Sequence, residues 1–259
     1  METRLTQRMK GRGISGCFLK VVAIITMLID HTGATIVERY LCEPDLSERT
    51  YQILYYLDML MRGIGRLAFP IFCFLIVEGF VHTHNLKKYI SRMVLFAILS
   101  EVPFDLAFGK SFFDYHHNSV FLTLLLGLLT MVGMHFLQEL SQKMVLIWQK
   151  ILCDLGMTGI MILGMFAVEW MHTDYGAAGV LAIGMIYIFR SRPILGMALA
   201  VFSLGITCGM SEWFAFADVI LLYFYNGTRG HQMKYFFYFF YPAHLLILST
   251  ICYLLGLGI

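Results

Sequence analysis

Three long stretches without Asp, Glu, Lys or Arg constrain this chain more than any other feature. They cover residues 115–138, 193–211 and 235–259. About 20 apolar residues are enough for a helix to cross the hydrocarbon core of a bilayer. Unpaired strand edges cannot face lipid, and these stretches are too long and continuous to be barrel strands. The sequence therefore predicts an all-α integral membrane protein.

The rest of the chain fits this class, because charged residues make up only 14% of its 259 residues, whereas a soluble domain has about a quarter. The stretch 51–62 has apolar residues at helical spacing and is interpreted as an interfacial helix, with a tenth span as the alternative. We find no internal repeat, so residues 1–259 are predicted to form a single polytopic transmembrane domain. Hydropathy predicts about nine transmembrane helices, near residues 18–37, 64–82, 88–108, 118–138, 153–171, 176–190, 193–210, 212–226 and 236–257.

The distribution of lysine and arginine predicts the orientation of the chain. With nine spans, residues 1–17 form a cytoplasmic tail and residues 38–63 an extracytoplasmic segment. Cytoplasmic loops of membrane proteins carry an excess of basic residues, so we expect the N-terminus to be cytoplasmic. Of the 19 lysines and arginines, the ones that this orientation leaves outside are Arg39, Arg49, Arg62, Arg66 and Lys110.

Polar side chains inside the predicted spans are the first candidates for a functional role. An ionisable group near the bilayer centre is unfavourable by at least about 2.5–3.5 kcal/mol, so it is rarely kept without a function. On the predicted map these side chains gather toward the outer ends of the spans. They are Asp30, His31, Arg66, Glu101, Asp105, Asn118 and Asp174.

Arg66 is predicted to form an ion pair with an acid of the third span. Glu101 and Asp105 are four residues apart and share a helix face, as Arg62 and Arg66 do. We expect Arg66 to pair with Glu101, with Asp105 as the substitute partner. The alternative is that such a pair only fixes the packing of two helices.

His31 is the predicted general base. Histidine exchanges a proton near neutral pH without any perturbation, and a positioned base accelerates a reaction by about 10²–10⁴-fold. Asp30 lies about 100° away around the helix and need not touch His31, so it serves either the ring or its surroundings. The alternative is that His31 only forms a hydrogen bond between helices, in which case His244 of the last span is the substitute base.

A second group of polar residues faces the predicted cytoplasmic side. Its members are Glu78, His82, Lys87, Lys88, Arg92 and Arg229, and His244 lies farther in from the same side. Basic groups in this position either flank the spans, as in most membrane proteins, or attract an anionic cytosolic ligand such as a nucleotide phosphate. We expect no metal site, because the paired histidines do not share a helix face and the cysteines are scattered without a CxxC pair.

Several sequence motifs together resemble the TraX family. They are "LKVVAIITMLIDHTGA", "RGIGRLAFPIFCFLIVEGFVHT", "YISRMVLFAILSEVPFDLAF", "NSVFLTLLLGLL", "DYGAAGVL" and "YNGTRG…KYFFYFFYPAHLLIL", in this order from about Leu19 to Leu248. The founding activity of that family is N-terminal acetylation of conjugative pilin. The resemblance implies a bacterial cytoplasmic-membrane acetyltransferase that uses acetyl-CoA as its acyl donor. The acceptor would be an extracytoplasmic amine or hydroxyl, on a protein N-terminus, a glycan or a lipid.

The resemblance also assigns expected roles to the candidate residues. Catalysis would involve His31, Asp30, Arg66, Glu101 and Asp105, and acceptor binding Asn118 and Asp174. Acetyl-CoA would be bound by Glu78, His82, Lys87, Lys88, Arg92, Arg229 and His244. Membrane lipids are further partners, nucleic acid is not expected, and a homodimer is left open. The alternative class is a transporter or proton-coupled carrier, which also needs intramembrane charges; a purely structural scaffold does not explain the polar cluster.

Overall fold

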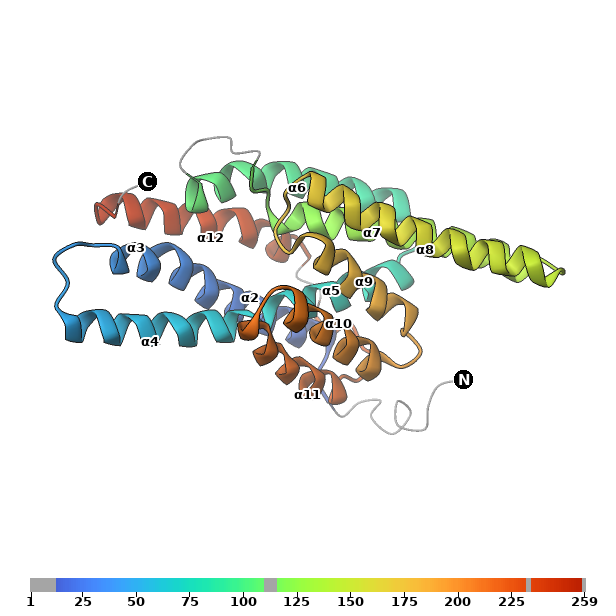
Figure 1. The fold of residues 1–259 in the computed structure, drawn as a ribbon, viewed down its shortest axis with the longest axis horizontal. Helices are drawn as coiled ribbons and strands as arrows, with labels where there is room; N and C mark the ends of the chain where they lie inside the picture. Colours follow the sequence, from blue (N-terminus) through green and yellow to red (C-terminus); the bar gives the residue numbers. More distant parts are fainter. Residues whose placement is uncertain (1–12, 110–115, 232–233, 258–259) are drawn as a thin grey trace.

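The computed structural model describes residues 13–109, 116–231 and 234–257, without the side chains of residues 234 and 235. Every regular element within these ranges is helical, which confirms the all-α prediction (Figure 1). The elements follow one another as α2 (Gly16–Thr32), the π-helical turn η1 (Gly33–Val37), α3 (Glu38–Leu41), α4 (Glu48–Gly65), α5 (Ala68–Val81), α6 (Leu86–Phe108), α7 (Val120–Lys143), α8 (Ile147–Trp170), α9 (Gly176–Ile188), α10 (Pro193–Thr207), the 3₁₀ segment η2 (Met210–Phe216), α11 (Ala217–Tyr223) and α12 (Lys234–Leu254).

Local sequence signals set where several of these helices begin. The hydroxyl of Ser15 accepts a hydrogen bond from the backbone N–H of Phe18 at the start of α2. The side chain of Asn85 accepts one from the N–H of Lys88 at the start of α6. Such caps satisfy amide donors that have no partner within the helix. α10 begins with Pro193, which lacks the N–H that would be unpaired there.

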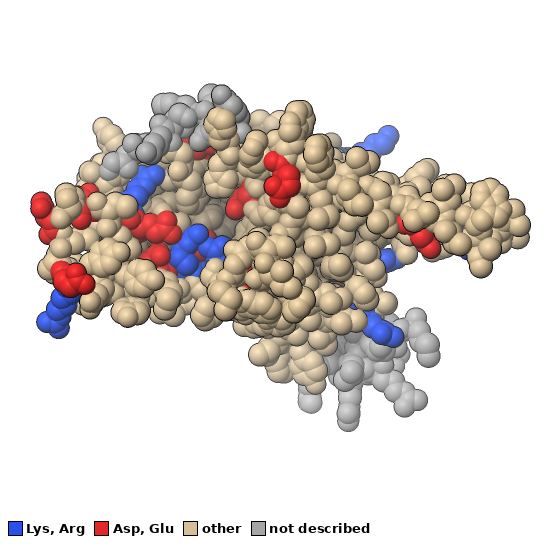
Figure 2. Space-filling view, in the orientation of Figure 1, with Lys and Arg blue, Asp and Glu red and all other residues tan. Residues whose placement is uncertain are grey.

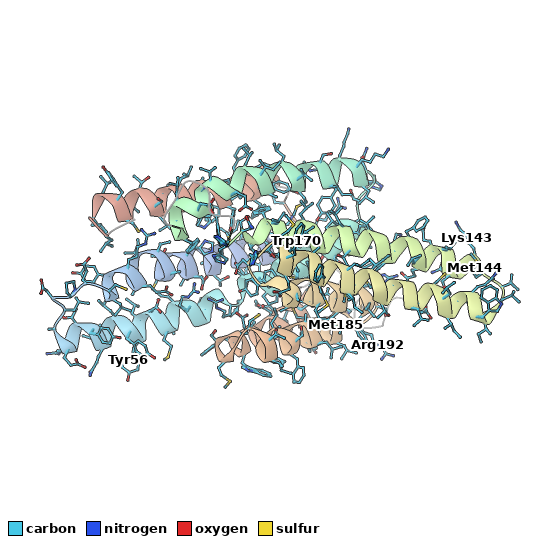
Figure 3. All side chains as sticks on the ribbon, turned by 45° about the horizontal axis from the view of Figure 1, so that its top comes forward. Tyr56, Lys143, Met144, Trp170, Met185 and Arg192 are labelled. Carbon is cyan, nitrogen blue, oxygen red and sulfur yellow. The ribbon has the colours of Figure 1, made fainter. Side chains whose placement is uncertain are left out.

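The helices pack as three groups that meet in the middle of the molecule. α2 packs on α4 and α5, α6 packs on α12, and α7, α8, α9 and α10 form a third group that contacts α5 through α9. Figure 1 shows α2, α4 and α12 extending toward one end, and the α7–α8 hairpin extending toward the other. Figure 3 shows Tyr56 of α4 near the first end and Lys143 and Met144 at the tip of the hairpin.

The tightest packing lies between α5, α7, α9 and α10. Side chains from these helices are almost completely shielded, among them Cys73, Leu128, Ala182, Ala200, Val201 and Leu204. By contrast, in α8 only 17% of its most apolar 18-residue window is buried within the protein. Its exposed residues are largely aliphatic and aromatic, as expected for a helix that faces lipid.

The described chain contains five helical stretches that are long and apolar enough to cross a membrane: residues 16–41, 48–81, 120–143, 147–170 and 236–254. The chain is thus a membrane protein by composition and helix length, but the predicted count of about nine spans is not confirmed. α9 and α10 are apolar but shorter, and the predicted span 212–226 is divided between η2 and α11. The orientation of the N-terminus stays a prediction, and residues 1–12 of the predicted tail lie outside the described ranges.

The predicted boundary between an interfacial helix and the second span is also displaced. α4 continues to Gly65, and α5 begins at Ala68, so the two form one nearly continuous helical stretch from Glu48 to Val81. Only Arg66 and Leu67 separate them. The break between the helices therefore falls at the charged side chain of Arg66.

Close contact between α7 and α8 depends on Gly164. A methyl group at this position would overlap Oγ1 of Thr130 and lie 3.0 Å from its Cγ2 atom, whereas a methyl group at Gly159 on the same helix would meet nothing within 4 Å. Thr130 is buried and stiff at χ1, so it cannot turn away easily. We therefore expect Gly164→Ala to destabilise the protein by about 1–3 kcal/mol.

The matched control is Gly159→Ala, which gains helix propensity of up to about 1 kcal/mol without a clash. Thermal unfolding of both variants in one detergent measures the difference. A melting temperature of Gly164→Ala equal to that of Gly159→Ala would contradict the described packing of α7 against α8.

Candidate functional site

The candidate site is a cavity of about 180 Å³ where the three groups of helices meet. Its polar lining residues are Asp30, His31, Glu38, Arg62, Arg66, His117, Asp174 and Tyr175. Its apolar lining residues are Met27, Ala34, Ala68, Phe69, Phe72, Phe104, Phe108 and Val120. Figure 2 shows basic and acidic side chains gathered around a hollow on this face, while most of the surrounding surface is uncharged. We call this space the histidine cavity.

Among the residues that the structure describes, the hydrogen-bond partner of the His31 ring is a second histidine and not a carboxylate. Its Nδ1 atom lies 2.7 Å from Nε2 of His244, and Nδ1 of His244 lies 2.8 Å from the backbone oxygen of Phe240. The two imidazole rings are nearly parallel, with an interplanar angle of 9°. The edge contacts that fix the His31 ring come from Phe108 and Tyr241. α12 thus brings His244 to the site, whereas the sequence placed it among residues for the acyl donor or as a substitute base.

The backbone changes its winding directly after His31. Residues Gly33–Val37 form a π-helical turn, and the hydroxyl of Thr35 donates a hydrogen bond to the backbone oxygen of His31 at 2.6 Å. Thr35 is completely buried. π-Helical turns are uncommon and frequently occur at functional sites. Here the turn and the threonine hydroxyl hold the backbone of the catalytic candidate in place.

Asp30 serves the surroundings of His31 rather than its ring. Oδ2 of Asp30 lies 2.9 Å from Nη1 of Arg62, and Oδ1 of Asp30 lies 3.1 Å from Nη2 of Arg66. This confirms that the two arginines share one helix face. The approach is close, because a methyl group at Gly65 would overlap the carboxylate of Asp30. Glu38 binds the Nε atom of Arg62 at 3.3 Å and extends the network toward α3.

The predicted pair of Arg66 with Glu101 is wrong. The guanidinium of Arg66 bridges Asp30 and Glu212, with Oε1 of Glu212 at 3.1 Å. Glu101 accepts hydrogen bonds from both the hydroxyl and the backbone N–H of Ser119, at 2.6 and 3.1 Å, and so caps the start of α7. Asp105 is buried on α6 and does not take the place of Glu101 at Arg66.

Sequence reasoning missed Glu212 and Tyr175. Glu212 is only 2% exposed, and the hydroxyl of Tyr175 accepts a hydrogen bond from Arg66 at 3.3 Å. Glu212 directly follows the charge-free stretch 193–211, and an acid at that boundary was a usable signal. Tyr175 has a positive φ of 62° and stacks on Phe69 with ring centres 3.8 Å apart. A tyrosine in the left-handed region is strained, so the stacking and the Arg66 contact hold it there.

The two predicted acceptor-binding residues, Asn118 and Asp174, are joined by a backbone hydrogen bond. The N–H of Asp174 donates to the oxygen of Asn118 at 2.9 Å, and the N–H of Asn118 donates to His172. The hydroxyl of Thr123 also donates to the backbone oxygen of Asp174. The Asp174 side chain lines the cavity, and its burial in the loop before α9 raises the pKa of its carboxyl group. Asn118 instead joins the start of α7 to that loop.

A second cavity of about 350 Å³ adjoins the histidine cavity. It shares Arg62, Arg66, Asp174 and Tyr175 with the histidine cavity, and its further lining residues are Cys208, Ser211 and Glu212. The two spaces therefore meet at these shared side chains.

The second polar group lies away from the cavity, around the loop after α11. Arg229 donates to the backbone oxygen of His82 at 2.6 Å, and the hydroxyl of Tyr225 donates to Glu78 at 2.9 Å. Burial and the neighbouring Glu78 raise the pKa of Tyr225. The contact between Nδ1 of His82 and Oε2 of Glu78 is weak, at 3.8 Å.

The loop "YNGTRG" clamps the start of α2. The N–H groups of Gly16 and Cys17 donate to the backbone oxygens of Thr228 and Arg229, at 2.8 and 3.0 Å. These first amides of the helix are therefore occupied and do not form an anion site. Lys87 and Lys88 are exposed at the start of α6, and Arg92 is half-buried one turn farther along.

Comparison with known proteins gives one family and one curated relative. The family model described as "TraX protein" matches residues 15–252. A protein of Dichelobacter nodosus named "Probable fimbrial assembly protein FimC, serogroup H1" is 27% identical over 256 residues, which cover 90% of this chain and 93% of that protein. No solved structure matches the chain.

The Arg66 bridge makes a prediction about stability. Replacing one member of a buried ion pair leaves the other charge unpaired and costs about 3–5 kcal/mol. We therefore expect Arg66→Met and Glu212→Met each to destabilise the protein strongly, and the double variant to lose about 0.5–3 kcal/mol less than the sum. The free energy of unfolding in detergent gives this double-mutant cycle.

Arg66→Met with Glu101→Met is the matched control cycle, because Glu101 binds Ser119 and not Arg66. Its two losses should add. If the losses of stability added in the Arg66 and Glu212 cycle, and a coupling energy occurred only in the Arg66 and Glu101 cycle, the described bridge would be refuted.

Proposed function

The chain belongs to the TraX family, and from this premise and the geometry of the histidine cavity we propose that it is a membrane-embedded acetyltransferase. It moves an acetyl group from acetyl-CoA to an amine or hydroxyl of an extracytoplasmic acceptor. The observation that carries the proposal is His31, which lines a small, half-apolar cavity and is held there by a second histidine. The association of the family with pilin acetylation supports the choice of reaction.

Two histidines line this cavity, and we choose His31 over His117 as the group that accepts a proton because His244 holds its ring. Both oxygens of Asp30 bind arginines, and Glu212 is bound to Arg66, so these carboxylates hold the site together. The acceptor nitrogen or oxygen attacks the carbonyl carbon of the thioester while His31 takes its proton. The new amide or ester bond forms, the carbon–sulfur bond breaks, and the proton passes to the departing CoA thiolate. The apolar wall formed by Phe72, Phe104 and Phe108 excludes water, which would otherwise hydrolyse the thioester.

The acyl donor enters from the side of the basic residues in this proposal. Lys20 lies on the same helix as His31, and His82 follows the helix that carries Phe72. At 1.5 Å per residue, each pair is separated by about 15 Å along the helix. α2 and α5 therefore connect half-buried Lys20 and exposed His82 with the cavity, and phosphate groups of the donor can remain outside while its thioester reaches His31.

The acceptor in this proposal is a pilin-like N-terminus on the extracytoplasmic side of a bacterial cytoplasmic membrane. The name of the Dichelobacter nodosus relative refers to fimbrial assembly, which supports a pilin-like acceptor over a glycan or lipid. Asp174 lines both cavities and is available to orient the acceptor. In this proposal the acceptor occupies the second cavity, which adjoins the histidine cavity at Arg66 and Tyr175, and the acetyl group occupies the histidine cavity.

The decisive experiment uses the purified protein in detergent with radiolabelled acetyl-CoA and a synthetic peptide that has a free N-terminal amine. We expect transfer of label to the peptide and release of CoA. His31→Gln should lower turnover at least about a hundredfold while acetyl-CoA binding and folding are preserved, because a positioned base contributes about 10²–10⁴-fold.

His135→Gln is the matched control. His135 is a partly buried histidine on α7 that bonds Tyr187 and does not line the cavity. It should keep near-normal turnover. Equal turnover of folded His31→Gln and His135→Gln would remove His31 as the base. Saturable uptake of a solute into proteoliposomes without thioester cleavage would instead support the transporter class.

The donor proposal predicts an effect of surface charge. We expect Lys87→Glu with Lys88→Glu to weaken acetyl-CoA binding by roughly 2- to 30-fold, since each exposed ion pair contributes about 0.2–1 kcal/mol. Isothermal titration at two salt concentrations measures the affinity, and the variant should also be less sensitive to salt because exposed charges are screened beyond about 8 Å at physiological ionic strength.

Lys143→Glu with Lys150→Glu serves as the control, because these exposed lysines lie near the distant tip of the α7–α8 hairpin (Figure 3). If both double variants bind acetyl-CoA equally well, the donor does not dock at Lys87 and Lys88.

A further inference from the structure

We propose that His244 is a positioning residue that keeps neutral His31 protonated at Nδ1, so that the lone pair of Nε2 of His31 is the basic site. This inference rests on the proposed function and deepens it, because it names the reactive atom and the group that selects it. It follows from the juxtaposition of His31, His244 and the backbone oxygen of Phe240.

The direction of each hydrogen bond follows from the final acceptor of the series, the backbone oxygen of Phe240. A carbonyl oxygen can only accept, so the contact of 2.8 Å between Nδ1 of His244 and the oxygen of Phe240 requires a proton on Nδ1. A neutral imidazole carries one N–H, which leaves Nε2 of His244 as an acceptor. The 2.7 Å contact then requires that Nδ1 of His31 donates. Nε2 of His31 is therefore the unprotonated nitrogen.

The surroundings favour the neutral form of His244. The residue is 4% exposed, and its contacts are the rings of His31, Phe240 and Tyr241. Within the described part of the chain, no carboxylate is bonded to either imidazole. A buried cation without such a partner is strongly unfavourable. Arg62 and Arg66 line the same cavity as His31 and disfavour a further positive charge on the His31 ring by charge repulsion.

The ring of His244 cannot easily turn, so the direction of the two hydrogen bonds cannot easily be reversed. It stacks on Phe240 with ring centres 4.9 Å apart and an interplanar angle of 15°, and Tyr241 closes its edge. Phe240 lies one helical turn before His244, so the acceptor of Nδ1 is part of the same rigid helix. The orientation of His244 is therefore set within α12. One hydrogen bond from His31 to His244 then sets the tautomer of His31 on α2.

This arrangement prepares His31 for the proposed proton transfer. When Nε2 of His31 takes a proton from the acceptor, its Nδ1–H keeps the same hydrogen bond to His244, so no ring has to rotate. The role resembles that of a carboxylate behind a catalytic histidine, but here the orienting group is neutral. Asp30 is adjacent in sequence and does not fill this role, because two arginines already bind its carboxylate.

The test uses the full-length protein in detergent with ¹⁵N-labelled histidine. Nitrogen chemical shifts distinguish the two neutral tautomers, and the spectrum of His31→Gln identifies the signals of His31. We expect the Nδ1–H form for His31 in the wild-type protein. In His244→Leu the acceptor is lost, and we expect a mixture of tautomers or the Nε2–H form, with kcat lowered at least about tenfold and the KM for acetyl-CoA unchanged, as for other groups that orient a catalytic histidine.

His244→Gln is the conservative variant, because its side-chain oxygen can accept the proton of Nδ1 in place of the imidazole nitrogen. It should keep the Nδ1–H form and recover most of the turnover lost in His244→Leu. The Nε2–H form of His31 in the wild-type protein overturns the proposal, and so does an unchanged tautomer in folded His244→Leu. The Nδ1–H form in a protein that transfers no acetyl group supports the assignment and refutes the proposed function instead.

Discussion

The site depends on one buried cation, the guanidinium of Arg66. It lies at the break between α4 and α5 and binds Asp30 of α2, Glu212 of η2 and Tyr175 of the loop before α9. These partners come from three separate parts of the chain, and each is largely shielded from the surroundings. A charge in an apolar region is tolerated only with partners of opposite sign. The need to pair Arg66 therefore fixes the relative positions of helices whose apolar surfaces would otherwise allow several arrangements.

The same network divides the cavity into a charged part and a neutral part. The carboxylates of Asp30 and Glu212 are bound to arginines and hold the helices together. The two histidines lie beside the aromatic side chains of Phe108 and Tyr241, apart from any bonded acid in the described chain. Structural charge and candidate chemistry are thus assigned to different residues, although Asp30 and His31 are neighbours in sequence. Their separation follows from helix geometry, which turns consecutive side chains by about 100°.

Sequence alone could predict the helices but only part of the site. The charge-free stretches that became α7 and α12 are recognisable from length and hydropathy, and polar residues at span ends marked the region of the cavity. The four-residue spacing of Arg62 and Arg66 predicted a shared face, but spacing does not tell which helix that face meets, so Glu101 was chosen in place of Asp30 and Glu212. The contact of His31 with His244 joins residues 213 positions apart and depends on tertiary packing, for which a single sequence contains no signal.

The position of His244 on the last helix also determines when the site can exist. During synthesis α2 enters the membrane first, and His31 then has no histidine partner until α12 has been made. The clamp of residues 224–229 on the start of α2 and the contact of Cys252 with the backbone of Thr35 likewise join the beginning of the chain to its end. Contacts over such long sequence separations form late in folding. The ribosome must therefore complete the whole chain before the site closes, and a nascent or C-terminally shortened protein lacks a formed centre.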